Sequence, residues 1–212
     1  QLKIKNKALV GISIICFLIL IGVSLSIHLV NKIHEETKEI HNKWMHSILK
    51  ISEMLDQLDN IGKLESKHIQ SNNSSEKMEL EEQLQSLQKD FFTNKIYYEK
   101  LSIDLEEKSI YGIFSRDVEE YFKTQTELIG KSKSTNKHGI LTLLENSKSL
   151  LDKVKTDLHE LLYLNQRGEI ESNHIVDKSY YSLLFQMILT SIFTVLFIYL
   201  VIYYTFKQFV FP

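Results

Sequence analysis

Three of the eight histidines have the spacing that a zinc site would need. His34 and His41 are seven residues apart, so they share one face of a helix. The sequence has two long apolar runs, and His34 and His41 follow the first of them. His174 precedes the second run by a similar number of residues. Three imidazoles brought together would hold Zn²⁺ or form a pH-sensitive patch. The simpler alternative is three histidines exposed on helix surfaces, and no cofactor is predicted.

A second set of residues has the chemistry of an anion site. Lys63, Lys67 and His68 supply positive charge, and Thr142 and Asn146 supply hydrogen-bond donors. They would bind a small anion as point charges, because the chain has only two arginines and neither lies near these lysines to form a bidentate fork. The alternative is a basic surface that contacts only solvent.

Signatures of catalysis are absent from the sequence. It contains no G-x-x-x-x-G-K-[ST] loop, no G-x-G-x-x-G and no H-E-x-x-H, and its one cysteine is Cys16. We therefore predict that the chain is not an enzyme and that nucleic acid is not among its partners.

Two apolar runs are long enough to anchor these residues at a membrane. Ala8–Val30 and about Leu183–Phe206 both reach the roughly 20 residues that a membrane-spanning helix needs. All 27 acidic residues lie between the runs, whereas three lysines precede the first run and Lys207 follows the second. The positive-inside rule then places both termini in the cytoplasm and the intervening domain outside. A cleaved signal peptide is the alternative for the first run, but that run is too long and lacks a small-x-small cleavage site.

Between the runs, apolar residues alternate in spacings of three and four, which indicates packed helices. Turn-like breaks at 70–75, 102–104 and 131–139 separate four such stripes, and Ser75 and Asp104 are the expected N-caps. We predict an all-α fold, with two transmembrane helices flanking an antiparallel up-down-up-down four-helix bundle. Helices 1 and 4 of the bundle are expected to be continuous with the membrane spans. A looser pair of long coiled coils is the alternative.

The fourth helix carries Asn165, Gly168 and Ser172 where its stripe calls for apolar residues. Such residues make a poor apolar seam, so we expect this segment to pack weakly and to permit a small movement of the helix as a signal relay. The alternative is a locally hydrated seam.

Both ends of the chain resemble those of bacterial chemoreceptors (methyl-accepting chemotaxis proteins) that have a four-helix-bundle sensor. Leu2–Gly11 is similar to the LKIxxKLxxGF start of that family, although Ala8 replaces a usual Leu and Ile12 stands where Phe is frequent. Lys207–Pro212 is similar to the basic-x-apolar-x-x-Pro start of a HAMP relay domain, and Leu161–Asn165 resembles an LxxLN late in the fourth helix.

This resemblance implies a homodimeric sensor module in the inner (plasma) membrane, surrounded by lipid. It would detect a small molecule or a periplasmic binding protein and signal through the second span to a cytoplasmic relay in a longer protein. The predicted parts are a cytoplasmic flank (1–7), transmembrane helix 1 (8–30), an extracytoplasmic sensor bundle (31–179), transmembrane helix 2 (180–206) and the start of a HAMP-like linker (207–212). The sensor half of a histidine kinase or a diguanylate cyclase, and a structural two-span tether, remain as alternatives.

Overall fold

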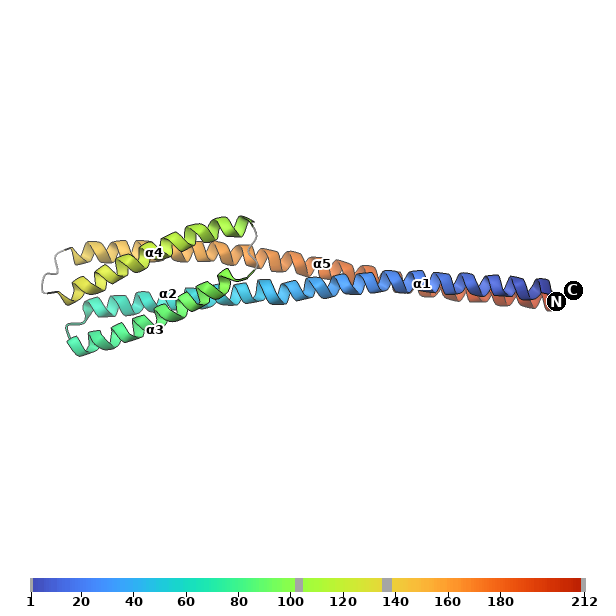
Figure 1. Ribbon diagram of the computed structural model, residues 1–212, viewed down its shortest axis with the longest axis horizontal. Coiled ribbons are helices and arrows are strands. Elements are labelled where there is room, and N and C mark those ends of the chain that lie inside the picture. The colour runs from blue at the N-terminus through green and yellow to red at the C-terminus, as the bar shows by residue number, and fades with distance from the viewer. Residues whose placement is uncertain (1, 102–104, 135–138, 211–212) are drawn as a thin grey trace. The chain divides into compact units, whose positions relative to one another are not determined.

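The computed structural model describes residues 2–101, 105–134 and 139–210, and these residues are almost entirely helical, with no β-strand among them (Figure 1). The elements are α1 (Leu2–Glu39), the π-helical turn η1 (Ile40–Met45), α2 (His46–Gln70), α3 (Ser74–Glu99), α4 (Leu105–Lys133) and α5 (Ile140–Val210). The predicted all-α class is confirmed. Because the only proline is Pro212, no ring interrupts α5, which runs for 71 residues.

The turn between α2 and α3 falls within the predicted break at 70–75, but its capping residue differs from the prediction. The side chain of Asn73, not Ser75, is the N-cap of α3: its Oδ1 accepts a hydrogen bond from the backbone N–H of Ser75 at 2.9 Å. That bond satisfies a backbone donor that the first turn of a helix leaves open. The expected break at 102–104, with Asp104 as a cap, and residues 135–138 lie outside the described residues.

The contacts between residues divide the chain into two compact units. Unit 2 is Ile40–Ile170, and unit 1 combines Gln1–Glu39 with Glu171–Pro212. Within unit 2, α2 and α3 lie side by side (Figure 1). The core of unit 2 contains buried residues from all four predicted stripes: Ile51, Met54, Leu58, Ile61, Leu84, Phe91, Tyr98, Phe114, Val118, Tyr121, Val154, Leu158 and Leu161. Within each helix, the buried residues recur every three or four positions, which confirms the predicted helix faces.

The register of contacts in unit 2 gives the direction of each helix. Residues 65 and 68 of α2 contact residues 121 and 132 of α4, so these two helices are parallel. Residues 59 and 62 of α2 meet residues 155 and 151 of α5, so α5 is antiparallel to α2. Residues 57 and 68 of α2 contact residues 94 and 81 of α3, so α3 is antiparallel to α2, and the four helices have the up-down-up-down order that the sequence predicted.

In unit 1, the two apolar runs contact each other at Gly22. The side chain of Gln186 donates from Nε2 to the carbonyl oxygen of Gly22 at 3.2 Å. A Cβ placed on Gly22 would lie 3.3 Å from Cγ2 of Thr190, so a small residue permits this close approach.

One helix in the described part of the chain, Ile140–Tyr204, is long and apolar enough to cross a membrane. It overlaps the second predicted span. The first predicted span, 8–30, is helical as part of α1, but the side chains of residues 8–12, 15 and 18 lie outside the described part. Its crossing of a membrane therefore stays a prediction.

Candidate functional site

The predicted anion-binding residues do not share one surface. Lys63 and Lys67 on α2 and Thr142 and Asn146 on α5 are exposed, whereas His68 is fully buried. His68 faces inward because it continues the spacing of three and four that defines the buried face of α2. An anion at the surface would therefore not meet His68, and binding by the four exposed residues stays a prediction.

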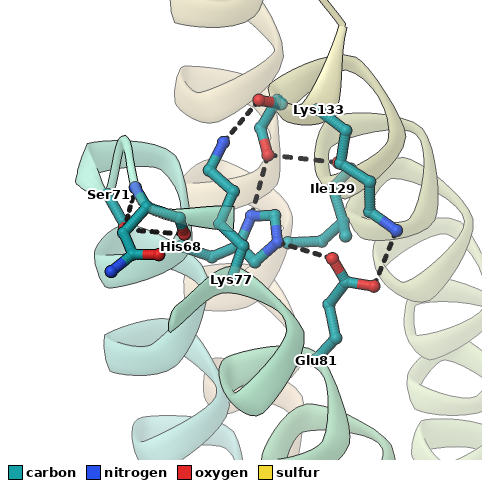
Figure 2. Close-up of polar contacts among 8 residues, drawn as sticks. His68, Ser71, Lys77, Glu81, Ile129 and Lys133 are labelled. Atoms are coloured by element: carbon teal, nitrogen blue, oxygen red, sulfur yellow. Dashed lines mark hydrogen bonds and ion pairs between the residues drawn. The ribbon is translucent and has the colours of Figure 1, made fainter. Parts of the chain in front are cut away.

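His68 instead joins three helices (Figure 2). Its Nε2 lies 2.9 Å from Oε1 of Glu81 on α3, and its Nδ1 lies 2.8 Å from Oγ of Ser132 on α4. The hydroxyl of Ser132 also donates to the carbonyl oxygen of Ile129 at 3.1 Å. The imidazole thus connects α2 to α3 and α4.

Two lysines add to this contact. Lys133 Nζ lies 2.6 Å from Oε2 of Glu81, and Lys77 Nζ donates to the carbonyl oxygen of Ser132 at 2.5 Å (Figure 2). Partial burial opposes ionisation of Glu81, but the hydrogen bonds from Lys133 and His68 prevail and lower its pKa. We call His68, Lys77, Glu81, Ser132 and Lys133 the His68 cluster.

Glu65, about one turn before His68, forms a second buried polar contact between α2 and α4. Its Oε2 accepts hydrogen bonds from Tyr121 Oη and Gln125 Nε2, each at 3.3 Å, and the residue is only 3% exposed. Burial raises the pKa of Glu65, and the neighbouring Ser147, Gln125 and Tyr121 offset this only in part. The charged form of Glu65 is thus disfavoured in the folded chain.

The predicted relay residue Asn165 is fully buried, and its amide nitrogen is hydrogen-bonded, whereas its Oδ1 has no hydrogen-bond partner among the described residues. Its Nδ2 donates to Oε1 of Glu107 at 2.8 Å, to Tyr98 Oη at 3.2 Å and to the carbonyl of Leu161 at 2.8 Å. Tyr98 Oη also donates to Oε1 of Glu107, so α3, α4 and α5 meet in one network. The expectation of weak packing at Asn165 is wrong, because the amide finds polar partners on two other helices.

Gly168, the second predicted relay residue, lies against an aromatic ring. A Cβ placed on Gly168 would lie 2.5, 2.6 and 2.7 Å from three ring atoms of Trp44. Lys43 covers the same indole, with Nζ 3.8 Å from the ring centroid. The expectation of weak packing is wrong at Gly168 too, because the indole of Trp44 fills the space that a side chain on residue 168 would occupy. Ser172, the third residue, is buried but belongs to unit 1. Signal relay by these three residues stays a prediction.

The π-helical turn η1, which carries Trp44, was not predicted from the sequence. Most π-helical turns occur singly within α-helices, frequently at functional sites. Here the turn lies between α1 and α2, where unit 2 begins along the chain.

The three histidines proposed for zinc fall into different units. His34 and His174 are exposed in unit 1, whereas His41 belongs to unit 2 and is described only in its backbone. Among the side chains that the structure describes, no three His, Cys, Asp or Glu residues are grouped to hold a metal ion. A site that includes His41 stays a prediction.

The sequence analysis placed Asn165 on the stripe of its helix but did not recognise the burial of Glu65, His68, Gln125 and Ser132, although a signal for that burial was present. The spacing of three and four continues from the apolar stripes through Glu65 and His68 on α2, Gln125 and Ser132 on α4, and Asn165 on α5. A polar residue at a buried position of such a repeat requires a partner. Continuing each stripe past its last apolar residue would have identified these positions.

The arrangement defines a class of protein: an all-α module in which buried polar contacts join the helices and one helix runs on into an apolar segment. Residues 1–180 match the profile of the family described as a four helix bundle sensory module for signal transduction, and the chain belongs to that family. The predicted resemblance to chemoreceptors with a four-helix-bundle sensor is confirmed. The family is a non-enzymatic signalling domain, and the prediction that this chain is not an enzyme stays a prediction. No curated protein sequence matched the chain.

Proposed function

We propose that this chain is the transmembrane sensor module of a bacterial chemotaxis receptor. In this proposal it is a homodimer in the plasma membrane, with both termini in the cytoplasm and residues 31–179 outside. A stimulus acts on the outer bundle, and the second span passes the change to a cytoplasmic relay.

The observation that supports this proposal most strongly is the continuity of α5. Residues of this helix form part of the core of unit 2, and the same helix continues through the apolar run to Val210. A helix without a break transmits a displacement or rotation along its length, which is a known way of switching. A stimulus can produce that change only if it binds the two packing states with different affinity.

A hybrid receptor tests the sensory role. Residues 1–212 would be joined to the cytoplasmic part of another chemoreceptor and expressed in cells that lack their own receptors. We expect kinase output to change with at least one stimulus among amino acids, organic acids and periplasmic extract. A hybrid that activates the kinase but responds to none of these would contradict the proposal. The same cytoplasmic part on unrelated membrane helices is the control.

Cysteine labelling tests the topology separately. In a Cys16→Ser background, Lys3→Cys and Ser75→Cys would be treated with a membrane-impermeant thiol reagent on intact cells. Position 75 should react and position 3 should react only after lysis. Labelling of both positions in intact cells, or of neither, would contradict the proposed arrangement.

A further inference from the structure

A glutamine within the second apolar run bonds across to the first run. Gln186 of α5 donates from Nε2 to the carbonyl oxygen of Gly22 in α1 at 3.2 Å. Both residues are half-buried in unit 1, whereas their chain neighbours Val23 and Met187 are exposed. The bond therefore joins the two runs on the faces by which they contact each other.

Two threonines on the same face of α5 bond within their own helix instead. Thr190 Oγ1 donates to the carbonyl oxygens of Gln186 at 2.9 Å and Met187 at 3.0 Å, and Thr194 Oγ1 donates to that of Thr190 at 2.8 Å. Because the hydroxyl of Thr190 turns back onto α5, its methyl carbon Cγ2 is the atom nearest to the position of a Cβ on Gly22. Gln186, with its longer side chain, is thus the residue of this face that bonds to α1.

Gly22 permits this bond at one register of the two helices. A Cβ on residue 22 would lie 3.3 Å from Cγ2 of Thr190, so the absence of a side chain lets α5 approach the backbone of α1. The other glycine of the first run, Gly11, is eleven residues away, which is about 16 Å along a helix. A small sliding or turning of α5 would therefore separate Gln186 from its acceptor without bringing it to a second glycine.

We infer that Gln186 is a latch between the two apolar runs: its bond to Gly22 holds α5 at one register against α1 and must break before α5 slides or turns. In the proposed topology the latch lies in lipid, where no water replaces a lost hydrogen bond. A hydrogen bond between membrane helices changes an equilibrium by about 3- to 30-fold, which favours one register and still lets a stimulus overcome it. The bond belongs to unit 1 alone, whereas its part in signalling rests on the proposed sensory function.

Disulfide formation in membranes measures the register of the full chain. In a Cys16→Ser background, Gly22→Cys would be combined with Thr190→Cys or, one turn further along the same face, with Thr194→Cys. A Cβ on residue 22 lies 3.9 Å from Cβ of Thr190, within the roughly 3.5–4.5 Å that a disulfide requires, and cysteine at position 190 removes the methyl group in the way. Mild oxidation should join 22 to 190 much faster than 22 to 194, in the monomer band of a non-reducing gel. If 22 and 190 are not joined, the contact does not exist and the latch is overturned.

Gln186→Met in these cysteine pairs tests the latch, because methionine keeps the length of the side chain and has no hydrogen to donate. The ratio of the 22–194 disulfide to the 22–190 disulfide should rise about 3- to 30-fold. Ser191→Ala, at an exposed position of the same run, is the matched control and should leave the ratio unchanged. An unchanged ratio in Gln186→Met, or an equal rise in the control, would show that the bond does not hold the register. Gln186→Leu provides the same comparison if the methionine variant is not recovered from membranes.

The hybrid receptor tests the part of the latch in signalling. Without any stimulus, the kinase output of Gln186→Met should be shifted from that of the parent hybrid toward the parent's stimulated level, because the displaced register is more populated. Ser191→Ala should keep the parent's output. If the parent hybrid responds to a stimulus and Gln186→Met has the parent's unstimulated output, the latch has no part in signalling. If the parent hybrid responds to no stimulus while the disulfide ratio rises in Gln186→Met, the proposed sensory function has failed and the latch stands.

Discussion

At one end of unit 2, hydrogen bonds between side chains join α2, α3 and α4 through His68, whereas at the other end the ring of Trp44 packs onto Gly168. The first contact is polar and directional, so charge can alter it without any change in volume. The second is steric, so one added carbon atom alters it at any pH. A change of charge and a change of side-chain volume are therefore expected to perturb different ends of the same helical unit.

The largest expected effects come from the steric end. Trp44→Ala should lower the free energy of unfolding by about 3–5 kcal/mol, because a buried indole leaves a cavity. Gly168→Leu should lower it by about 2–3 kcal/mol, since its Cβ meets the ring. In the double variant the cost of leucine should largely disappear, because the ring is gone. Thermal unfolding of the full chain in detergent measures all three.

This double-mutant cycle separates the steric contact from two unrelated defects. If the costs of Trp44→Ala and Gly168→Leu simply add, residue 168 does not depend on the ring, and the contrast between the two ends is lost. Trp44 is the only tryptophan, so its fluorescence also reports whether the ring has moved in Gly168→Leu.

The polar end should respond to loss of the imidazole. His68→Ala is expected to lower the free energy of unfolding by about 2 kcal/mol, because the hydrogen bonds to Glu81 and Ser132 are lost from a buried site. His159→Ala, at an exposed position of α5, should change it by less than about 0.5 kcal/mol. Equal effects of the two substitutions on the unfolding midpoint would show that the His68 cluster does not hold this end together.

A smaller effect, dependent on pH, is expected at Glu65. Its pKa is raised in the folded chain, so the folded state binds more protons and loses stability as pH rises above the ordinary pKa of a glutamate. Glu65→Gln should remove that loss and stabilise the chain at pH 7.5 by about 1 kcal/mol, with no gain at pH 4. The measurement is the unfolding midpoint as a function of pH. A gain of the same size at both pH values would mean that ionisation of Glu65 is not the cause.

The helix faces could be predicted from the sequence because each depends on local spacing. Leu58 and Leu158, for example, are buried wherever the partner helix comes from. The polar contacts depend on partners far along the chain: Ser132 is 64 residues beyond His68, and no local pattern pairs them. Weak packing was wrongly expected at Gly168 because its partner is also far along the chain. The ring that fills its space belongs to Trp44 in a π-helical turn, which sequence spacing does not reveal.

The smallest effect is expected at Gly62, a second glycine, which faces α5 and can be compared with Gly168. A Cβ on Gly62 would lie 2.7 Å from Cδ2 of Leu151, nearly as close as the contacts that Gly168 would make. The obstacle at Gly62, however, is the end of a flexible side chain that can change rotamer, whereas an indole moves only as a whole. Gly62→Ala should therefore cost almost nothing or gain up to about 0.5 kcal/mol, since alanine favours a helix over glycine. The matched substitution Gly168→Ala should destabilise the chain. Equal unfolding midpoints for the two alanine variants would show that distance alone, and not the rigidity of the neighbour, determines what a glycine position tolerates.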